Sequence, residues 1–426
     1  MDTNANDAPS KYSEIFKRSD SESWLDAVEE ENKALLANKV FIQVNSLPEG
    51  KNLVKAKYIF KRKSDGRYKA RLVAKGYSQV FGVDFKEVYA PVVSKNSLRM
   101  LLALAAEERW NIHQLDVKTA FLHGDLEEDI YMEAPEGMPF QKGSILRLNK
   151  SLYGLKQAPR QWNIKLDKFI ASCGFTRCRV DSSVYIKGSG NNATIIAVYV
   201  DDMLIFGHDN KFICDFKSKL NDQFKIDDLG EVRNILGMEV NINRSDNTIS
   251  LSQRAYINKL IDKFRMKDAK SRPKCVPLYK TDYNTVMDIH SKQAQPTSMP
   301  YKSALGGLLY TNVCCRPDIS FPISVLTSHN QNPKQVHWNS LMNVIRYLKQ
   351  TNHFEIKYGD RQENQLRHGI YIYADADYAR DPVKYRSRSG FVIYMNGGPI
   401  SWHSDLQERV AGSTSEAELY AMYADV

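Results

Sequence analysis

The chain has 426 residues and a formal net charge of +9, because 59 Lys and Arg residues face 50 Asp and Glu residues. This length and a hydrophobic content of 42% predict a globular protein of roughly two to four domains, with no membrane-spanning run and no secretory signal peptide. The six cysteines form no Cys-x-x-Cys pair, which argues against a zinc site or a disulfide framework. The excess of cationic residues suits a polyanionic partner, although many proteins without such a partner share it.

The first part of the chain predicts a helix followed by strands. Residues 1–20 are polar and are expected to be disordered, and Ser21 to Asn38 is typical of an amphipathic helix with Ser21 or Ser23 as its N-cap. Strands are predicted over 40–44, 54–63 and 68–75, the last two joined by a tight turn at Asp65-Gly66.

Basic side chains crowd this hairpin: Lys55, Lys57, Lys61, Arg62, Lys63, Arg67, Lys69, Arg71 and Lys75. On alternating positions of a β-ribbon they would present one face of cations to phosphate groups. A solvated edge hairpin that uses Lys to prevent aggregation explains the same residues, so both interpretations stay open.

A single carboxylate stands out in the next segment. An apolar helix is predicted over 97–108, a strand over 110–117 and an acidic turn over 125–129. Asp116, near the end of the strand, is placed either to bind a metal ion beside a substrate loop or to cap the segment that follows.

A short strand over 146–150 precedes the loop Ser151 to Trp162, and a helix is predicted over 163–172. Gly154 permits close backbone approach, and Lys156 brings positive charge to the start of the helix, where backbone N–H groups favour anions. The loop therefore predicts either a phosphate site or an ordinary turn with Pro159 in the first turn of the helix.

Two adjacent acids lie at the tip of an apolar hairpin. Runs rich in β-branched and aromatic residues flank Asp201 and Asp202 within 193–207, which predicts two buried strands joined by a tight turn. The two carboxylates repel each other unless a cation compensates, which indicates a divalent metal, whereas Asp-Asp also simply favours turns.

The second half of the chain ends in a region of different character. After a linker over 267–300, an apolar strand carries Asp375, and a later helix carries Glu418; this pair predicts either a second metal site or a capped helix with surface acids. The predicted helices are 210–224, 253–264, 301–315, 319–330, 335–350 and 413–422, and the predicted strands are 233–242, 248–252, 369–378, 388–395 and 398–402.

Several motifs in one order resemble the copia-type retrotransposon reverse transcriptases. The long motifs are Gln114-Leu-Asp-Val-Lys-Thr-Ala-Phe-Leu-His-Gly-Asp-Leu126, Ser151-Leu-Tyr-Gly-Leu-Lys-Gln-Ala-Pro-Arg-Gln-Trp162 and Tyr199-Val-Asp-Asp-Met203. Supporting motifs are Lys69 to Gly76, Ile235 to Glu239, Arg346 to Leu348, Tyr373 to Asp377 and Ser415 to Glu418. The resemblance extends from about Trp24 onward, and ordered motifs are more specific than any single one.

This resemblance implies an α+β fold: a right-hand polymerase with fingers, thumb and a palm built on an antiparallel sheet, then a connection and a partial α/β ribonuclease H-like domain. The implied segments are a disordered N-terminus (1–20), the polymerase (21–266), a linker (267–300), a helical connection (301–360) and the ribonuclease H-like domain (361–426).

The resemblance also implies the site residues. Asp116, Asp201 and Asp202 would be catalytic and, with Val117, would hold two Mg²⁺ ions, with Mn²⁺ as an alternative. The implied dNTP-binding residues are Lys69, Arg71, Phe121, Gly154, Lys156 and Gln157, among which Phe121 would exclude a ribose 2′-hydroxyl. Leu236 and Gly237 resemble the turn that grips the primer.

The ribonuclease H-like part departs from the family pattern. Tyr378 and Arg380 stand where the family usually has Trp and Gly, and Asp405 and Leu406 replace its basic residues. Val426 follows closely on the helix that carries Glu418, so a further catalytic Asp is absent and ribonuclease H activity through Asp375 and Glu418 is expected to be lost.

The predicted function is RNA-directed DNA polymerisation within a retrotransposon polyprotein. The expected partners are an RNA template, a DNA primer, the RNA/DNA hybrid, dNTPs and other polyprotein products, with no membrane, in a cytoplasmic virus-like particle or the nucleus. The alternatives are a catalytically silent nucleic-acid-binding remnant and a remnant that does not fold stably.

Overall fold

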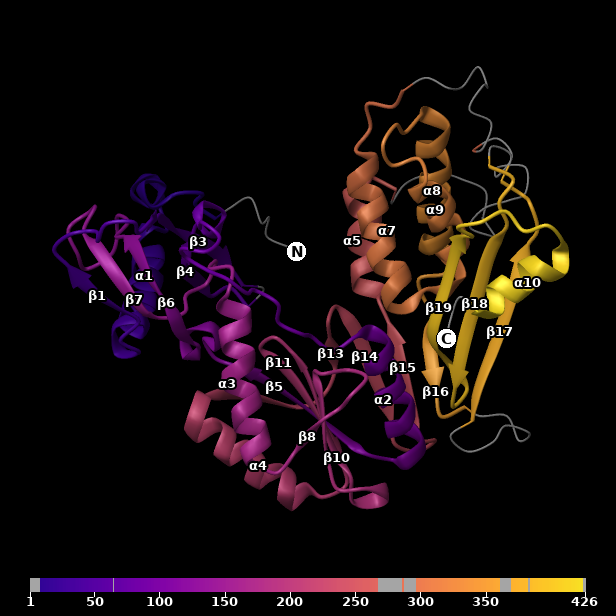
Figure 1. Ribbon diagram of the computed structural model, residues 1–426, viewed down its shortest axis with the longest axis horizontal. Coiled ribbons are helices and arrows are strands. Elements are labelled where there is room, and N and C mark those ends of the chain that lie inside the picture. The colour runs from indigo at the N-terminus through magenta and orange to yellow at the C-terminus, as the bar shows by residue number, and fades with distance from the viewer. Residues whose placement is uncertain are drawn as a thin grey trace. The chain divides into compact units, whose positions relative to one another are not determined.

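The computed structural model describes residues 8–63, 65–266, 286, 296–360, 369–381 and 384–423. Two compact units are present: the first comprises 1–93, 114–205 and 209–230, and the second comprises 94–113, 206–208 and 231–426. Helices and mostly antiparallel strands are mixed in both, which agrees with the predicted mixture of helix and sheet (Figure 1). No helix in the described ranges combines the length and apolarity that crossing a membrane requires.

The first unit carries most of the predicted polymerase segment. Its helices are α1 (Ser21–Ala37), α3 (Ala158–Ser172) and α4 (Asn210–Phe224). Its strands are β1 (Phe41–Val44), β2 (Leu53–Val54), β3 (Ala56–Arg62), β4 (Tyr68–Ala74), β5 (Asn111–Val117), β6 (Asp125–Glu133), β7 (Ile145–Lys150), β8 (Thr176–Arg177), β9 (Val184–Lys187), β10 (Thr194–Tyr199), β11 (Asp202–Gly207) and β12 (Ile226–Glu231).

Helix α1 packs against the β3–β4 hairpin, and the two share a core with the four-stranded sheet β1-β7-β6-β2. Trp24 is fully buried there and contacts Phe60 and Tyr68 edge to face. The predicted N-cap of α1 was wrong, since Asp20 occupies that position and its carboxylate accepts a hydrogen bond from the Trp24 indole.

The expected disorder of residues 1–20 was wrong for the part that the structure describes. Tyr12–Lys17 forms a short 3-10 helix, because the apolar side chain of Ile15 is completely buried in the same core. Residues 1–7 lie outside the described ranges.

A six-stranded sheet in the order β12-β5-β11-β10-β9-β8 forms the second layer of the unit. Helices α3 and α4 cover it and bury Trp162, Phe216 and Phe224 in a continuous apolar cluster. Two predictions were wrong in detail: α3 begins at Ala158, five residues early, and the expected acidic turn over 125–129 is the start of strand β6.

The second unit combines a helical layer with two sheets. Its helices are α2 (Lys95–Glu108), α5 (Arg254–Lys263), α7 (Tyr301–Cys315), α8 (Ser320–Thr327), α9 (Gln335–Gln350) and α10 (Thr414–Tyr423). Its strands are β13 (Asn234–Ile235), β14 (Met238–Asn243), β15 (Thr248–Ser252), β16 (Ile356–Tyr358), β17 (Ile370–Asp377), β18 (Arg388–Met395) and β19 (Gly398–Leu406). Helices α5, α7, α8 and α9 pack side by side around one core (Figure 1).

The two compact units are not the predicted segments, whose boundaries stay a prediction. Strands β13–β15 and helix α5, which the sequence grouped with the polymerase, belong to the second unit. The predicted linker lies almost entirely outside the described residues, and so does Cys275. The other five cysteines are free thiols.

A buried guanidinium joins three elements of the second unit. Arg99 of α2 is 2% exposed and donates to the carbonyl oxygens of Ile400 (2.8 Å), Val313 (2.7 Å) and Cys314 (3.0 Å), while Trp402 stacks on it at 3.9 Å. Four peptide or ring partners compensate the cost of burying this charge. The contact fixes α2 on β19 and α7.

A buried histidine gives the second unit a pH dependence. His337 is 1% exposed, its Nδ1 accepts from the Lys334 N–H (3.0 Å), and its ring stacks on His329 at 3.9 Å. Burial lowers the pKa of His337 to about 4. The unfolded chain therefore takes up the proton first, so this contribution to stability is complete above about pH 6.5 and is lost as the pH falls toward 4.

We expect the free energy of unfolding to fall by about 2 kcal/mol between pH 7 and pH 5 on account of His337. Denaturant titrations of the wild type and of His337→Gln at both pH values measure the difference. Equal pH dependence of the two proteins would contradict the assignment.

Candidate active site

The two adjacent acids occupy the turn between β10 and β11. Val200 has a left-handed backbone (φ 58°), an unfavourable conformation for a β-branched residue, and the indole N–H of Trp162 donates to its carbonyl oxygen at 2.7 Å. The Val117 N–H donates to the carbonyl oxygen of Asp201 at 3.0 Å. The first bond ties the turn to α3, and the second ties it to the end of β5.

Asp116 lies within β5, one residue before that contact, and not at a helix N-cap. The following 3-10 helix, Ala120–His123, is preceded by Thr119. Asp116 and Asp201 line one cavity of about 440 Å³. The structure thus brings together two of the three predicted carboxylates and excludes the capping alternative for Asp116.

Asp202 lies next to this cavity without lining it. Its Oδ1 accepts a long hydrogen bond (3.5 Å) from the buried amide of Gln114. Burial, and secondarily the charge of Asp201, raises the pKa of Asp202. Burial, together with the charges of Asp201, Asp202 and Asp227, raises the pKa of Asp116 to about 6. The charge of Asp201 therefore adds to burial in making the ionisation of Asp116 and Asp202 costly.

The donor chemistry of this cluster fits a hard divalent cation. Carboxylate oxygens are the ligands that Mg²⁺ prefers, and a cation would relieve the repulsion that raises the pKa of Asp116. Within the described ranges, however, no three His, Cys, Asp or Glu side chains are already grouped as a metal site. The observed geometry therefore places two of the three predicted metal ligands, Asp116 and Asp201, in one cavity, with Asp202 next to it.

Basic residues, mostly from the β3–β4 hairpin, line the same cavity as the acids, and we call them the cationic wall. In the antiparallel β3–β4 ribbon, Lys61 pairs with Lys69 and Ile59 with Arg71, so these side chains share one face, while Phe60 and Leu72 are buried on the other. The cavity is lined by the basic residues Lys63, Arg67, Lys69, Arg71 and Lys118 and by the acids Glu30, Glu31, Asp116, Asp201 and Asp227. Burial and the neighbouring Arg71 lower the pKa of Lys69. The ribbon therefore presents cations to the cavity that the carboxylates line. That these cations bind phosphate groups stays a prediction.

An aromatic pair extends the wall. The Arg71 guanidinium lies 4.5 Å from the centre of the Tyr153 ring, and Tyr153 contacts Phe121 edge to face at 4.9 Å. Phe121 thus connects to the cationic wall through Tyr153. Burial raises the pKa of Tyr153 to about 12, so its hydroxyl is neutral at physiological pH.

The predicted residues of the 151–162 loop make packing contacts and hydrogen bonds outside the cavity. Gly154 has φ +90°, and a Cβ built there would lie 2.1 Å from the carbonyl oxygen of Ala74. Gln157 is 0% exposed and bonds to Gln79, Glu128 and the Asp84 carbonyl. Lys156 lies over the Phe85 ring at 4.4 Å. The structure does not bring Lys156 or Gln157 to the cavity.

The predicted primer turn lies in the second unit. Leu236 and Gly237 both have positive φ (49° and 71°), and the Tyr310 hydroxyl donates to the carbonyl oxygen of Leu236. A Cβ at Gly237 would meet that hydroxyl at 2.3 Å, so only glycine admits this contact.

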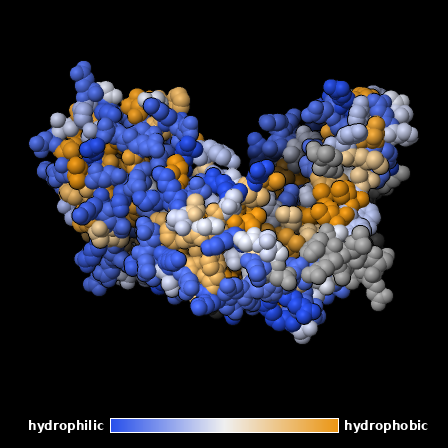
Figure 2. Space-filling view, turned by 60° about the horizontal axis from the view of Figure 1, so that its bottom comes forward, coloured by the Kyte–Doolittle hydropathy of each residue, from blue (hydrophilic) through white to orange (hydrophobic). Residues whose placement is uncertain are grey.

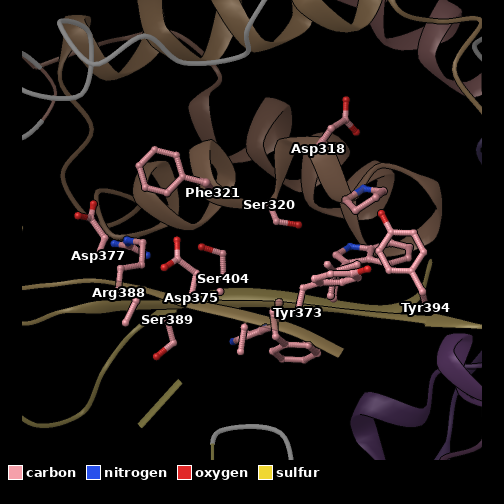
Figure 3. A pocket seen from close by; sticks show the side chains of 18 of the residues that line it. Asp318, Ser320, Phe321, Tyr373, Asp375, Asp377, Arg388, Ser389, Tyr394 and Ser404 are labelled. Carbon is pink, nitrogen blue, oxygen red and sulfur yellow. The ribbon is translucent and has the colours of Figure 1, made fainter. Parts of the chain in front are cut away.

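The second predicted acid pair is not brought into one cavity. Asp375 of β17 lines a hollow of about 820 Å³ in the second unit, where Asp375, Arg388 and Ser404 point to the side of Ser320 and Phe321 and Ser389 points away (Figure 3). Gln407 bonds to Ser389 and to the Ala417 carbonyl of α10, so α10 lies on the face opposite Asp375. Glu418, on α10, does not line the hollow.

Three residues that contribute to the acid-lined cavity or its surroundings were not predicted from the sequence. Glu31 of α1 lines the cavity, Tyr153 links Arg71 to Phe121, and Gln114 holds Asp202. Gln114 and Tyr153 lie inside the motifs Gln114 to Leu126 and Ser151 to Trp162, so membership of these motifs could have identified them. The acids of α1 resemble an ordinary solvated helix face, so no pattern singles out Glu31.

Asp116 and Asp201 share their cavity with the cations of the β3–β4 ribbon. Such a site suits a divalent cation bound together with a polyphosphate. A family model described as "Reverse transcriptase (RNA-dependent DNA polymerase)" matches residues 38–280. The chain belongs to this family, in the group of copia-type retrotransposon Pol polyproteins.

The curated relatives of the chain are retrotransposon proteins as well. The chain is 41% identical over 424 residues to the retrovirus-related Pol polyprotein from transposon TNT 1-94 of Nicotiana tabacum, covering 97% of this chain and 31% of that one. It is 35% identical over 402 residues to that of transposon RE2 of Arabidopsis thaliana (93% and 27%). A putative transposon Ty5-1 protein of Saccharomyces cerevisiae is 32% identical over 312 residues, covering 71% and 96%. The chain thus spans about a third of the length of the plant relatives.

A solved structure of the foamy viral protease-reverse transcriptase in complex with RNA/DNA hybrid aligns with 94% of this chain and 45% of that one, at 13% identity and a TM-score of 0.45.

Proposed function

We propose that the chain is an RNA-directed DNA polymerase that extends a primer with dNTPs as part of a retrotransposon polyprotein. The observation that carries the proposal is the cavity that Asp116 and Asp201 share with Lys69 and Arg71. Membership of the reverse transcriptase family supports the same reaction. The fingers, palm and thumb would be built from residues 21–266, with the acids on the palm sheet.

Asp116 and Asp201, with Asp202 behind them, would hold the divalent ions, which when bound neutralise phosphate charge and activate the primer 3′-hydroxyl. The Val117–Asp201 bond keeps the two strand ends in register for this task. Gln114, which donates to Asp202, would limit the movement of that side chain.

Lys69 and Arg71 would bind the triphosphate, since both face the cavity. Phe121, packed on Tyr153, would lie against the sugar and exclude a 2′-hydroxyl by bulk. Primer and template would form an RNA/DNA hybrid gripped at Leu236 and Gly237. Figure 2 shows part of the surface of the first unit on the left, and the part in view is mostly hydrophilic. Loss of ribonuclease H activity stays a prediction.

A primer-extension assay with and without metal tests the proposal. We expect the protein to incorporate dNTPs on an RNA template in Mg²⁺, and to stop when EDTA removes the ion. Added Mg²⁺ should restore extension, and Mn²⁺ should substitute for it. Salt-sensitive binding of the hybrid without extension would refute the polymerase and favour the silent nucleic-acid-binding alternative.

A further inference from the structure

Helix α1 contributes an acid to the cavity that the proposed function does not use. Glu31 is half-buried and lines the cavity together with Lys69, Arg71 and Asp116. A carboxylate among residues that would bind a triphosphate repels the nucleotide, so the presence of Glu31 needs another explanation. Its contacts show that purpose.

Glu31 occupies the outer edge of strand β4. The β3–β4 hairpin is a sheet of two strands, so one edge of β4 has no neighbouring strand. On that edge the Leu72 N–H donates to Glu31 Oε1 (3.0 Å), and the Ala74 N–H donates to the carbonyl oxygen of Tyr153 (2.8 Å). Buried edge N–H groups need such acceptors, and these two are placed two residues apart, as the strand repeat requires.

The first of these two anchors, at Leu72, directly follows the side chains that would bind phosphate. Lys69 and Arg71 alternate with Ala70 and Leu72 along β4, so the strand position at Leu72 sets where Arg71 leaves the backbone. From there the Arg71 guanidinium reaches its place 4.5 Å above Tyr153. A shift of β4 at Leu72 would move Arg71 off this ring and away from the cavity.

We propose that Glu31 is a positioning residue of the nucleotide site: its carboxylate oxygen fixes β4 through the Leu72 N–H, so that Lys69 and Arg71 face the carboxylates before a nucleotide arrives. The inference rests on the proposed polymerase function. Preorganisation of this kind improves binding because the cost of ordering the strand is met during folding.

Charge and hydrogen bonding can be separated at this position. Burial raises the pKa of Glu31, while the Leu72 N–H and the nearby Arg71 and Lys69 act in the opposite direction. Glu31→Gln removes the charge but keeps an oxygen acceptor at the same reach. Glu31→Asp keeps the charge but shortens the side chain by one methylene, which withdraws the oxygen from Leu72.

The test is steady-state primer extension with dNTP as the varied substrate. We expect Glu31→Asp to raise KM for dNTP about tenfold with kcat within about twofold, because a displaced Arg71 binds the triphosphate less well. Glu31→Gln should stay within about threefold of wild type in KM. Glu29→Asp is the matched control, since Glu29 lies on the same helix, is exposed and pairs with Lys33, and does not line the cavity, so this variant should behave like wild type.

Thermal unfolding of each variant accompanies the kinetics. A purely structural role would lower the melting temperature and the active fraction without changing KM, and this result would overturn the proposal. Equal KM for wild type and Glu31→Asp, or a Gln variant as impaired as the Asp variant, would overturn it as well. An inactive wild type would instead refute the proposed function.

Discussion

Asp116→Asn is expected to reduce primer extension at least about 1,000-fold and, in the absence of divalent metal, to make the fold more stable. The loss of activity follows because Asp116 is one of the two proposed metal ligands that line the cavity, and the neutral amide is a poor ligand for a hard cation. The gain in stability follows from the burial of this charge and, secondarily, from repulsion by Asp201 and Asp202, which together raise the pKa of Asp116 to about 6.

The sign of the stability change depends on pH. The folded state binds the proton of Asp116 more tightly than the unfolded chain, so ionised Asp116 destabilises the fold above about pH 6, and this penalty disappears toward pH 4. With allowance for solvent screening of a half-buried group, we expect Asp116→Asn to raise the free energy of unfolding by about 1 kcal/mol at pH 7.5 in EDTA. At pH 4 the gain should vanish.

Extension assays in Mg²⁺ and denaturant titrations in EDTA measure the two effects. Asp201→Asn should abolish extension in the same way. The control is Asp129→Asn, an exposed acid paired with Arg147, which should change neither quantity appreciably. Persisting activity in Asp116→Asn or Asp201→Asn would contradict the placement of the proposed metal ligands, and a lower stability of Asp116→Asn would contradict the repulsion.

The strongly patterned elements were predictable from sequence. Helix α4 has the predicted bounds because Asp209 caps its first turn, accepting from the Phe212 N–H, and Ile213, Phe216 and Leu220 form its buried stripe. The β3–β4 hairpin follows from Asp65-Gly66 and from alternation between cationic and apolar positions.

The errors arose where local composition competes with tertiary pairing. The acids of 125–129 suggested a turn, but they alternate with half-buried positions, and Asp125 pairs with Lys150 across the sheet. The loop was predicted to run to Trp162, so the predicted start of α3 was five residues late. The alternative that placed Pro159 in the first turn of the helix is the one the structure has, because the missing N–H of proline has no partner to lose there. The two-residue strand β8 is too short to show a period.

The same distinction applies to the site. Asp116 and Asp201 were predictable because each ends or follows an apolar strand within a recognisable motif. The left-handed Val200 that aims Asp201 was not, because a valine carries no turn preference, and its conformation depends on Trp162 from α3. Glu31 was equally hidden, since only the packing of α1 on β4 brings its carboxylate to Leu72.

Gly154→Ala is expected to destabilise the first unit by about 3 kcal/mol or more and to impair nucleotide binding. A Cβ at this position would lie 2.1 Å from the Ala74 carbonyl oxygen and 2.6 Å from Val73 Cγ1, and the residue has φ +90°, which alanine rarely adopts. Neither β4 nor the loop can yield easily, because the Ala74 N–H is bonded to the Tyr153 carbonyl at 2.8 Å.

The matched control is Gly82→Ala, because Gly82 has φ +82° but a Cβ added there would have no heavy atom within 4 Å. This variant isolates the backbone strain, which should cost about 1 kcal/mol. The excess loss in Gly154→Ala then measures the close approach of the loop to β4. Since the displaced loop carries Tyr153 away from Arg71, the KM for dNTP should rise as well. Equal destabilisation of the two variants in denaturant titrations would show that the loop can move aside, and that the contact between Gly154 and Ala74 does not hold the nucleotide site together.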